Sequence, residues 1–89
     1  MNHDNISIQH DQQNNMFYIR LNGSAAHLKY EKPKENVVNI KETYVPAAAR
    51  KIGLASQLVK HTIQLAKSQN KQVVASCSFA KSYMKKHAA

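Results

Sequence analysis

Apolar and polar residues alternate along the first half of the chain with the period of two that is typical of β-strands. The alternation is clearest over residues 17–21 and 26–30. Asn22-Gly23 lies between these segments and is a strong hairpin signal, because both turn positions require a positive φ. A β-branched and aromatic run over 37–45 predicts a further strand, which Pro46 ends.

Two polar segments divide the rest of this half. Ile6 and Ile8 flank Ser7 and predict a first strand, which a polar turn at 11–15 follows. Residues 33–36 form a polar connection, since Pro33 cannot donate a hydrogen bond to a sheet ladder. The pattern therefore predicts an antiparallel meander of four strands.

The period changes to that of an amphipathic helix from Leu54 onwards. One stripe of this helix carries Ala55, Leu58, Val59, Thr62, Ile63 and Ala66. Residues 69–71 break the helix, and the short apolar run at 72–76 predicts a strand that is covered on both faces. Phe79, Tyr83 and Met84 recur at helical spacing and predict a final short helix. The order β-β-β-β-α-β-α indicates an α+β fold in one domain spanning residues 1–89.

The charge is concentrated in the second half of the chain. The 89 residues contain 13 lysines and arginines against 5 acidic residues, a formal net charge of +8. No acidic residue follows Glu42, so the whole excess lies in the half that begins at Thr43. We therefore expect an anionic partner: a nucleic acid, a phosphorylated cofactor or an anionic surface. The same absence excludes a carboxylate metal cluster built from this half.

Other features of the composition favour the cytoplasm. No apolar run approaches the roughly 18 residues of a membrane span, so no membrane partner is expected, and the N-terminus lacks the apolar core of a signal peptide. Cys77 is the only cysteine, which excludes an internal disulfide and fits a reducing compartment. His3 and His10 are too far apart for a recognised metal motif, so no metal site is expected.

The segment from Arg50 to Ser56, between a strand and a helix, is the strongest candidate for chemistry. Successive backbone N–H groups at the start of a helix form an anion pocket, and Gly53 would let a phosphate approach the backbone. The alternative is a packing glycine beside a solvated Arg50-Lys51 pair. The segment lacks the second glycine of a nucleotide P-loop and the three glycines of a dinucleotide fingerprint.

Arg50-x-x-Gly53-x-Ala55 resembles the loop with which the GNAT acetyltransferase superfamily binds the pyrophosphate of acetyl-CoA. A wider set of residues resembles the small YjdJ-like branch of that superfamily. This set comprises Glu42-Thr43-Tyr44-Val45-Pro46, Arg50, Gly53-Leu54-Ala55-Ser56, Ser76-Cys77-Ser78-Phe79, Tyr83 and His87. The resemblance spans residues 38–87, more than half of the chain.

The resemblance implies that the strands at 38–45 and 72–77 splay apart and admit acetyl-CoA, the acetyl donor, between them. The pyrophosphate would rest on the amides of residues 51–56, beside basic side chains. The implied cofactor-binding residues are Tyr44, Val45, Arg50, Lys51, Ile52, Gly53, Leu54, Ala55, Ser56, Tyr83 and Lys86. Tyr83 would either protonate the CoA thiolate or pack on pantetheine.

Two residues are candidates for catalysis. Cys77 matches a cysteine of the YjdJ-like branch and would act as thiol acid or nucleophile, or else is a small buried hydrophobe. Glu42 is the last carboxylate before the site, but many relatives have histidine there, so a shared general base does not follow from the resemblance. His27 and His61 are expected to be solvated.

The leading hypothesis is a GNAT-type protein that binds acetyl-CoA and acts as an N-acetyltransferase on an amine of unknown identity, such as a protein or peptide. It would be a monomer or a weak dimer. One alternative is a CoA-binding module without catalysis. The other is a small basic nucleic-acid-binding protein, which the lack of aromatic residues among the second-half lysines and of any RNA-binding motif makes the weaker alternative.

Overall fold

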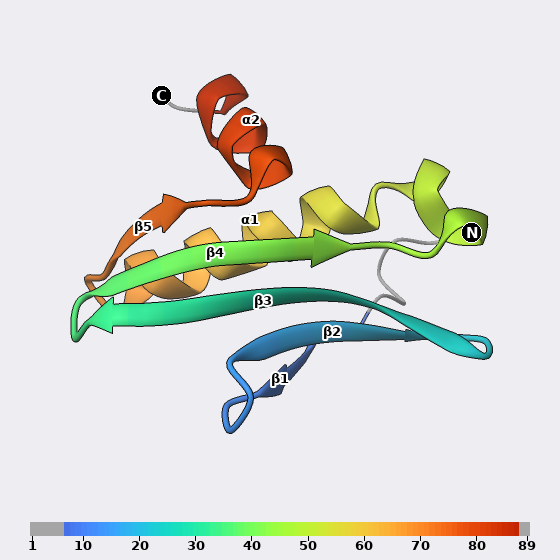
Figure 1. Ribbon diagram of the computed structural model, residues 1–89, viewed down its shortest axis with the longest axis horizontal. Coiled ribbons are helices and arrows are strands. Elements are labelled where there is room, and N and C mark those ends of the chain that lie inside the picture. The colour runs from blue at the N-terminus through green and yellow to red at the C-terminus, as the bar shows by residue number, and fades with distance from the viewer. Residues whose placement is uncertain (1–6, 88–89) are drawn as a thin grey trace.

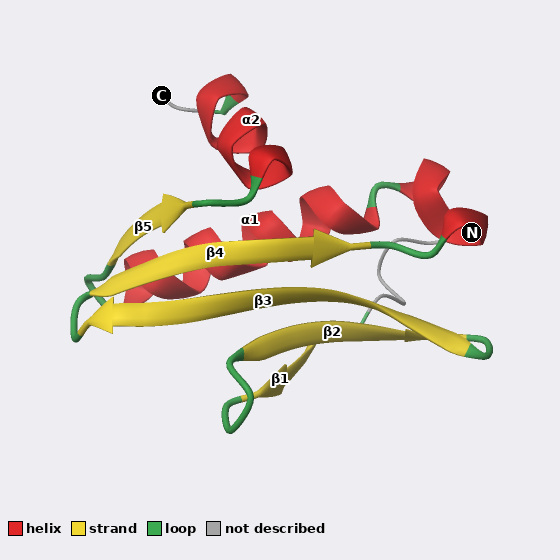
Figure 2. Cartoon of the chain, in the orientation of Figure 1, coloured by secondary structure: helices red, strands yellow, loops and turns green. Residues whose placement is uncertain are grey.

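The computed structural model describes residues 7–87, apart from the side chain of Lys51. Its elements are β1 (Gln9–Asp11), β2 (Met16–Leu21), β3 (Ser24–Lys34), β4 (Val37–Tyr44), a 3₁₀ helix (Ala47–Ile52), α1 (Leu54–Ser68), β5 (Gln72–Ala75) and α2 (Ser78–Lys86). The order along the chain agrees with the sequence prediction, and the helix α1 begins at the predicted residue (Figures 1 and 2).

The five strands form one mixed sheet in the order β1-β2-β3-β4-β5. The first four strands are an antiparallel meander, and β5 pairs with β4 in parallel. The parallel pair requires a crossover, which α1 provides. Figure 1 shows α1 lying along the sheet. The strand β5 turns away from β4 and leads into α2. The fold is the small α+β arrangement that the sequence predicts.

The core lies between the sheet and α1. Its largest fully buried side chains come from β3, β4 and α1 and are Leu28, Ile40, Leu54, Leu58 and Val59. The helix ends in a left-handed residue, Asn70, whose φ is 58°, and the Lys71 N–H donates to the Ala66 carbonyl at 2.8 Å. This bonding pattern is that of a Schellman motif, and it is the physical form of the helix break predicted at 69–71.

Two expectations about strand limits were wrong. The first strand is Gln9–Asp11 rather than the segment around Ser7, and Ile6 lies outside the described residues. The third strand continues through Pro33 to Lys34, because a shift in its register with β4 after Glu31 accommodates a residue that cannot donate.

The other departures concern the hairpin and β5. In the turn at Asn22-Gly23 only the glycine has a positive φ, 80°, so the expectation that both turn positions have a positive φ was wrong. The last strand is covered on one face only: Val73 and Ala75 are half-buried, whereas Val74 is 38% exposed. Its apolar run therefore does not mark a strand buried on both sides.

A β-bulge in β4 decides which face its last residues occupy. Lys29 pairs with Glu42, but the next residue of β3, Tyr30, pairs with Ile40, so Lys41 is an extra residue in β4. Ile40 faces the core, whereas both Lys41 and Glu42 are exposed. Beyond the bulge, Thr43 lies opposite the buried Leu28 and returns to the α1 side of the sheet.

Among residues 7–87, none of the helices has the length and apolar character needed to cross a membrane.

Candidate functional site

The two parallel strands, β4 and β5, separate halfway along β4. Their pairing ends at Ile40, opposite Ala75. The Ile40 carbonyl then accepts hydrogen bonds from the N–H groups of both Ser76 and Cys77, at 3.0 and 3.1 Å. Residues Lys41–Tyr44 have no partner in β5. The predicted splay is therefore confirmed, and it is limited to the second half of β4, where a free strand edge faces the start of α2.

The segment after β4 leads into α1 with its backbone N–H groups uncovered. Gly53 has a φ of 77°, and a Cβ built there would meet nothing within 4 Å. No side chain caps the helix and no acidic residue lies in its first turn. The Gln57 N–H is the first amide to bond within the helix, to the Gly53 carbonyl at 3.1 Å. The amides at the start of α1 therefore remain available to an anion.

A pocket of about 360 Å³ lies between this segment and the splayed strands. It is lined by Thr43, Tyr44, Val45, Arg50, Ala55 and Phe79. The Arg50 Nε donates to the Val45 carbonyl at 3.0 Å, which holds the guanidinium at the end of β4. Four predicted residues, Tyr44, Val45, Arg50 and Ala55, thus meet in one pocket.

The remaining predicted cofactor residues are distributed differently. Leu54 is buried in the core, Ser56 is half-buried and Ile52 is 54% exposed beside Gly53. The side chain of Lys51 lies outside the described part of the chain. Tyr83 stacks on His87 at 4.2 Å and lines a separate groove between α1 and α2.

Lys86 is exposed in the last turn of α2. Neither Tyr83 nor Lys86 lines the pocket that contains Arg50. Thr43 and Phe79 do line it and were not singled out individually from the sequence. The apolar pattern of β4 contains a signal for Thr43. Val38, Ile40 and Val45 all face the core, which strict alternation does not allow, so the side chains must change faces between 40 and 45.

Cys77 lies at the start of α2, on the side of β4 that faces the pocket. Its Sγ contacts the Thr43 Oγ1 at 3.6 Å. Burial raises the pKa of the Cys77 thiol, but the N–H groups of Phe79 and Ala80 and the hydroxyl of Thr43 outweigh burial and lower it. The pKa of this half-buried thiol therefore lies below that of an ordinary cysteine.

We expect iodoacetamide to alkylate Cys77 with a pH midpoint below that of a free thiol, since the thiolate is the reactive form. Thr43→Val removes one stabilising hydroxyl and is expected to raise the midpoint. Rates measured by mass spectrometry between neutral and alkaline pH test both statements. Ser82→Ala in the same helix is the control, and equal midpoints for Thr43→Val and the parent would contradict the role of the hydroxyl.

The opposite face of the sheet carries a paired histidine and carboxylate. The His27 Nε2 lies 2.6 Å from the Glu42 Oε2, and this hydrogen bond lowers the pKa of Glu42. The ring of Tyr44 lies 5.4 Å from that of His27. The expectation that His27 is solvated was wrong, because the register of β3 and β4 brings it beside Glu42.

Two further expectations about histidines can be compared with the structure. His61 is half-buried, with its ring edge-on to Phe17 at 5.1 Å, so it is not simply solvated. Within residues 7–87 no cluster of three or more potential ligands could hold a metal ion, and His3 lies outside that range.

Three comparisons place these features among known proteins. Residues 16–89 match the model of the GCN5-related N-acetyltransferase family. Protein NATD1 of Mus musculus is 31% identical over 84 residues, covering 92% of this chain and 76% of its own. Protein NATD1 of Gallus gallus is 30% identical with the same coverage.

A solved structure agrees with the sequence matches. The solution structure of a GCN5-like protein from Staphylococcus aureus superposes with a TM-score of 0.74 at 32% identity, over 92% of this chain and 80% of that one. The family match covers β2 to β4 of the meander, the splayed strands and the helix α1, which begins at Leu54. The chain belongs to the GCN5-related N-acetyltransferase family.

Proposed function

We propose that this protein binds acetyl-CoA between β4 and β5 and transfers its acetyl group to an amine. The observation that carries the proposal is the free edge of β4 beyond Ile40, with the uncapped amides that follow Gly53 at its end. Thr43 and Tyr44 of this edge and Ala55 of the first turn of α1 line one pocket. Bound there, acetyl-CoA would supply the activated acetyl thioester.

The residues present fit the pyrophosphate of this donor. The N–H groups of residues 54–56 have no side-chain cap, and the positive end of the helix dipole favours an anion beside them. Gly53 leaves the approach open, since a Cβ would project into empty space. Arg50 adds a permanent charge at a position fixed by its bond to Val45.

The pocket also fits a pantetheine chain. The unpaired edge of Lys41–Tyr44 offers backbone groups in the manner of a missing neighbouring strand. The exposed ring of Phe79, 40% accessible, provides an apolar wall, whereas the ring of Tyr44 lies beside His27. A flexible arm with amide groups and methylene groups matches both kinds of surface.

The acceptor would approach the bulged part of β4 from the face opposite α1. Glu42, oriented by His27, would take the proton that an ammonium group must lose before it can attack. Cys77, on the α1 side beside Thr43, would return a proton to the departing thiolate, a role that its lowered pKa supports. The described residues place no helix over this face, so an exposed amine of a protein or peptide fits an acceptor site of this openness.

Titration with acetyl-CoA tests the binding. We expect the amide resonances of residues 51–56 and 41–45 to shift saturably, while those of the Asn22-Gly23 turn do not. Desulfo-CoA and 3′-dephospho-CoA separate the contributions of the thioester end and the adenosine phosphates. If the amides after Gly53 do not shift at about 1 mM acetyl-CoA, a weak affinity by any standard, the proposal is wrong.

Glu42→Gln is expected to lower the rate of transfer about 10²-fold at neutral pH, the usual contribution of a general base, with little change in acetyl-CoA binding. His27→Gln is expected to lower the rate by a smaller factor, because it removes only the group that orients the carboxylate and leaves the base itself in place. Thiol release with a panel of amines and lysine peptides measures both. Lys29→Gln, exposed on the same face, is the control. Unchanged turnover in Glu42→Gln would remove the pair from the mechanism.

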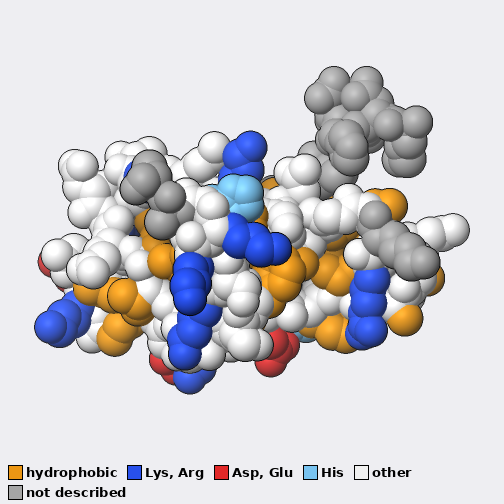
Figure 3. Space-filling view, turned by 90° about the horizontal axis from the view of Figure 1, so that it is seen from above, with side chains coloured by type: hydrophobic (Ala, Val, Ile, Leu, Met, Phe, Trp, Pro, Cys, Tyr) orange, Lys and Arg blue, Asp and Glu red, His pale blue; other side chains and the backbone are white. Residues whose placement is uncertain are grey.

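The alternatives have different signatures. Saturable acetyl-CoA binding without thiol release for any acceptor would identify a CoA-binding module. Strongly salt-dependent binding to arbitrary RNA without CoA binding would identify a nucleic-acid-binding protein. On the face seen in Figure 3, the lysine and arginine side chains lie in separate groups with apolar side chains between them, which gives little support to the second alternative.

A further inference from the structure

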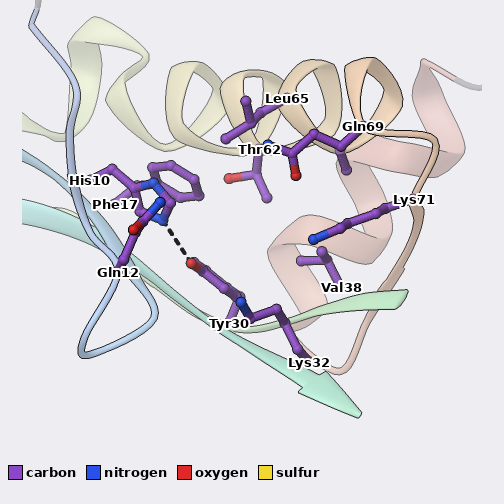
Figure 4. Close-up of a pocket in the computed structure, with 11 residues that line it drawn as sticks. His10, Gln12, Phe17, Tyr30, Lys32, Val38, Thr62, Leu65, Gln69 and Lys71 are labelled. Atoms are coloured by element: carbon purple, nitrogen blue, oxygen red, sulfur yellow. Dashed lines mark hydrogen bonds between the residues drawn. The ribbon is translucent and has the colours of Figure 1, made fainter. Parts of the chain in front are cut away.

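A second pocket lies towards the C-terminal end of α1, away from Gly53 (Figure 4). Its volume is about 210 Å³. Thr62, which lines it, follows Gly53 by nine residues, a distance of about 14 Å along a helix. The pocket shares no lining residue with the proposed acetyl-CoA pocket, so the two are separate sites on the surface.

The charged side chains that line this pocket are all basic. Lys32 enters from β3 and Lys71 from the segment before β5, and His10 adds a group that can gain a charge. No lining residue is acidic. Neither lysine lies within 4.0 Å of a carboxylate of residues 7–87. Two ammonium groups at one small cavity repel each other, and a bound anion would relieve that repulsion.

The wall of the pocket is a fixed hydrogen-bonded pair. The Tyr30 hydroxyl lies 2.7 Å from the His10 Nε2, and the His10 ring stacks on Phe17 at 4.1 Å. Tyr30 is only 7% exposed, so its hydroxyl cannot turn freely to bulk water. Figure 4 shows this hydroxyl directed toward the space beneath α1.

The position of Lys71 is set by the end of α1. Its N–H is bound to the Ala66 carbonyl at 2.8 Å, because Asn70 adopts the left-handed conformation. The side chain is half-buried. Figure 4 shows its ammonium group pointing into the pocket, between the Tyr30 side and the helix. A lysine whose role was solubility alone would extend into solvent.

We infer that this pocket binds a small oxyanion, a phosphate or carboxylate group held between the ammonium groups of Lys32 and Lys71 and the hydroxyl of Tyr30. The amide side chains of Gln12 and Gln69 lie at the same pocket and supply further donors. The volume corresponds to about seven water molecules, at roughly 30 Å³ each. It admits inorganic phosphate or a short dicarboxylate and is too small for a nucleotide.

Protonation of His10 strengthens this site. When neutral His10 carries its proton on Nδ1, its Nε2 accepts a hydrogen bond from Tyr30, whereas protonated His10 donates there and frees the tyrosine O–H for the anion. Burial lowers the pKa of His10, and the neighbouring His61 and Lys32 lower it further, against a smaller opposite effect of Asp11. A bound anion counteracts these effects, so binding and protonation of His10 favour each other.

The test is a titration of the full chain with inorganic phosphate and with succinate at constant ionic strength, followed by amide and imidazole resonances. We expect saturable shifts at His10, Tyr30 and Lys71, tighter binding of succinate at pH 6 than at pH 8, and a higher pKa of His10 in the presence of the ligand. The paired variant Lys32→Gln with Lys71→Gln is expected to weaken binding at least about tenfold, since each charged donor contributes to it. The relative affinities of phosphate and succinate identify the preferred oxyanion.

Lys81→Gln with Lys85→Gln removes the same charge from the exposed face of α2 and is the matched control. An equal loss of affinity in the control would mean that the weaker binding comes from the lower net charge alone, and it would overturn the inference. Absence of saturable shifts at about 10 mM ligand would overturn it as well. The His10 pKa of the parent protein, with and without phosphate, gives a result that does not depend on any variant folding. None of these outcomes depends on acetyl-CoA binding.

Discussion

Gly53→Ala is expected to weaken acetyl-CoA binding at least about tenfold, or ~1.4 kcal/mol. Gly53 has a φ of 77°, and its Cα faces empty space beside the first amides of α1. An alanine Cβ would occupy the position from which a phosphate approaches those amides, and its backbone would be strained by about 1–2 kcal/mol. Calorimetric or amide-shift titration with acetyl-CoA measures the first effect, and urea unfolding measures the second.

Gly23→Ala is a matched control for this variant. Gly23 has nearly the same φ, 80°, and equally open surroundings, but it lies in the hairpin between β2 and β3. Both variants are expected to lose similar stability, and only Gly53→Ala to lose affinity. If the two variants bound acetyl-CoA equally well, the amides after Gly53 would not be the pyrophosphate site.

Leu58→Ala is expected to lower the free energy of unfolding by about 2–5 kcal/mol, as other buried leucines do. Leu58 is fully buried between α1 and the sheet, and the truncation leaves a cavity that α1 cannot close without losing its contacts to β3 and β4. Domains of this size are stabilised by only about 5–15 kcal/mol, so the variant would be close to unfolding at physiological temperature.

Urea unfolding followed by circular dichroism measures this loss as a lower midpoint at unchanged slope. Lys60→Ala lies in the same helix and is exposed, so its effect is expected to stay within about 0.5 kcal/mol. A loss of comparable size in both variants would mean that the effect of Leu58→Ala does not come from the packing of α1 on the sheet. A change in slope would indicate that unfolding is not a single step.

The sequence predicted those parts of the fold that local periodicity determines. The stripe containing Leu58, Val59 and Thr62 predicted α1 with its first residue, and Gly23 marked the hairpin. Periodicity failed where long-range pairing decides the outcome. Pro33 belongs to β3 because β4 tolerates a register shift beside it, and no residue near Pro33 indicates this.

The same distinction applies to the candidate site. The segment from Arg50 to Ala55 is contiguous in sequence, and the structure brings Arg50 and Ala55 into one pocket with Tyr44. The pair of His27 and Glu42 is fifteen residues apart, and only the register of β3 with β4 brings it together. The basic pocket at His10 draws on five separate segments of the chain, which no motif search would combine.

The bulge at Lys41 decides which chemistry each face of β4 carries. If the same residues alternated strictly after Ile40, without the bulge, Glu42 would face inward, and Thr43 and Val45 would turn towards solvent. The acidic and the thiol-facing sides of the strand would then exchange places without any change in side-chain type. A change of phase in the backbone, rather than a residue identity, thus separates the proton-accepting face of this protein from its cysteine.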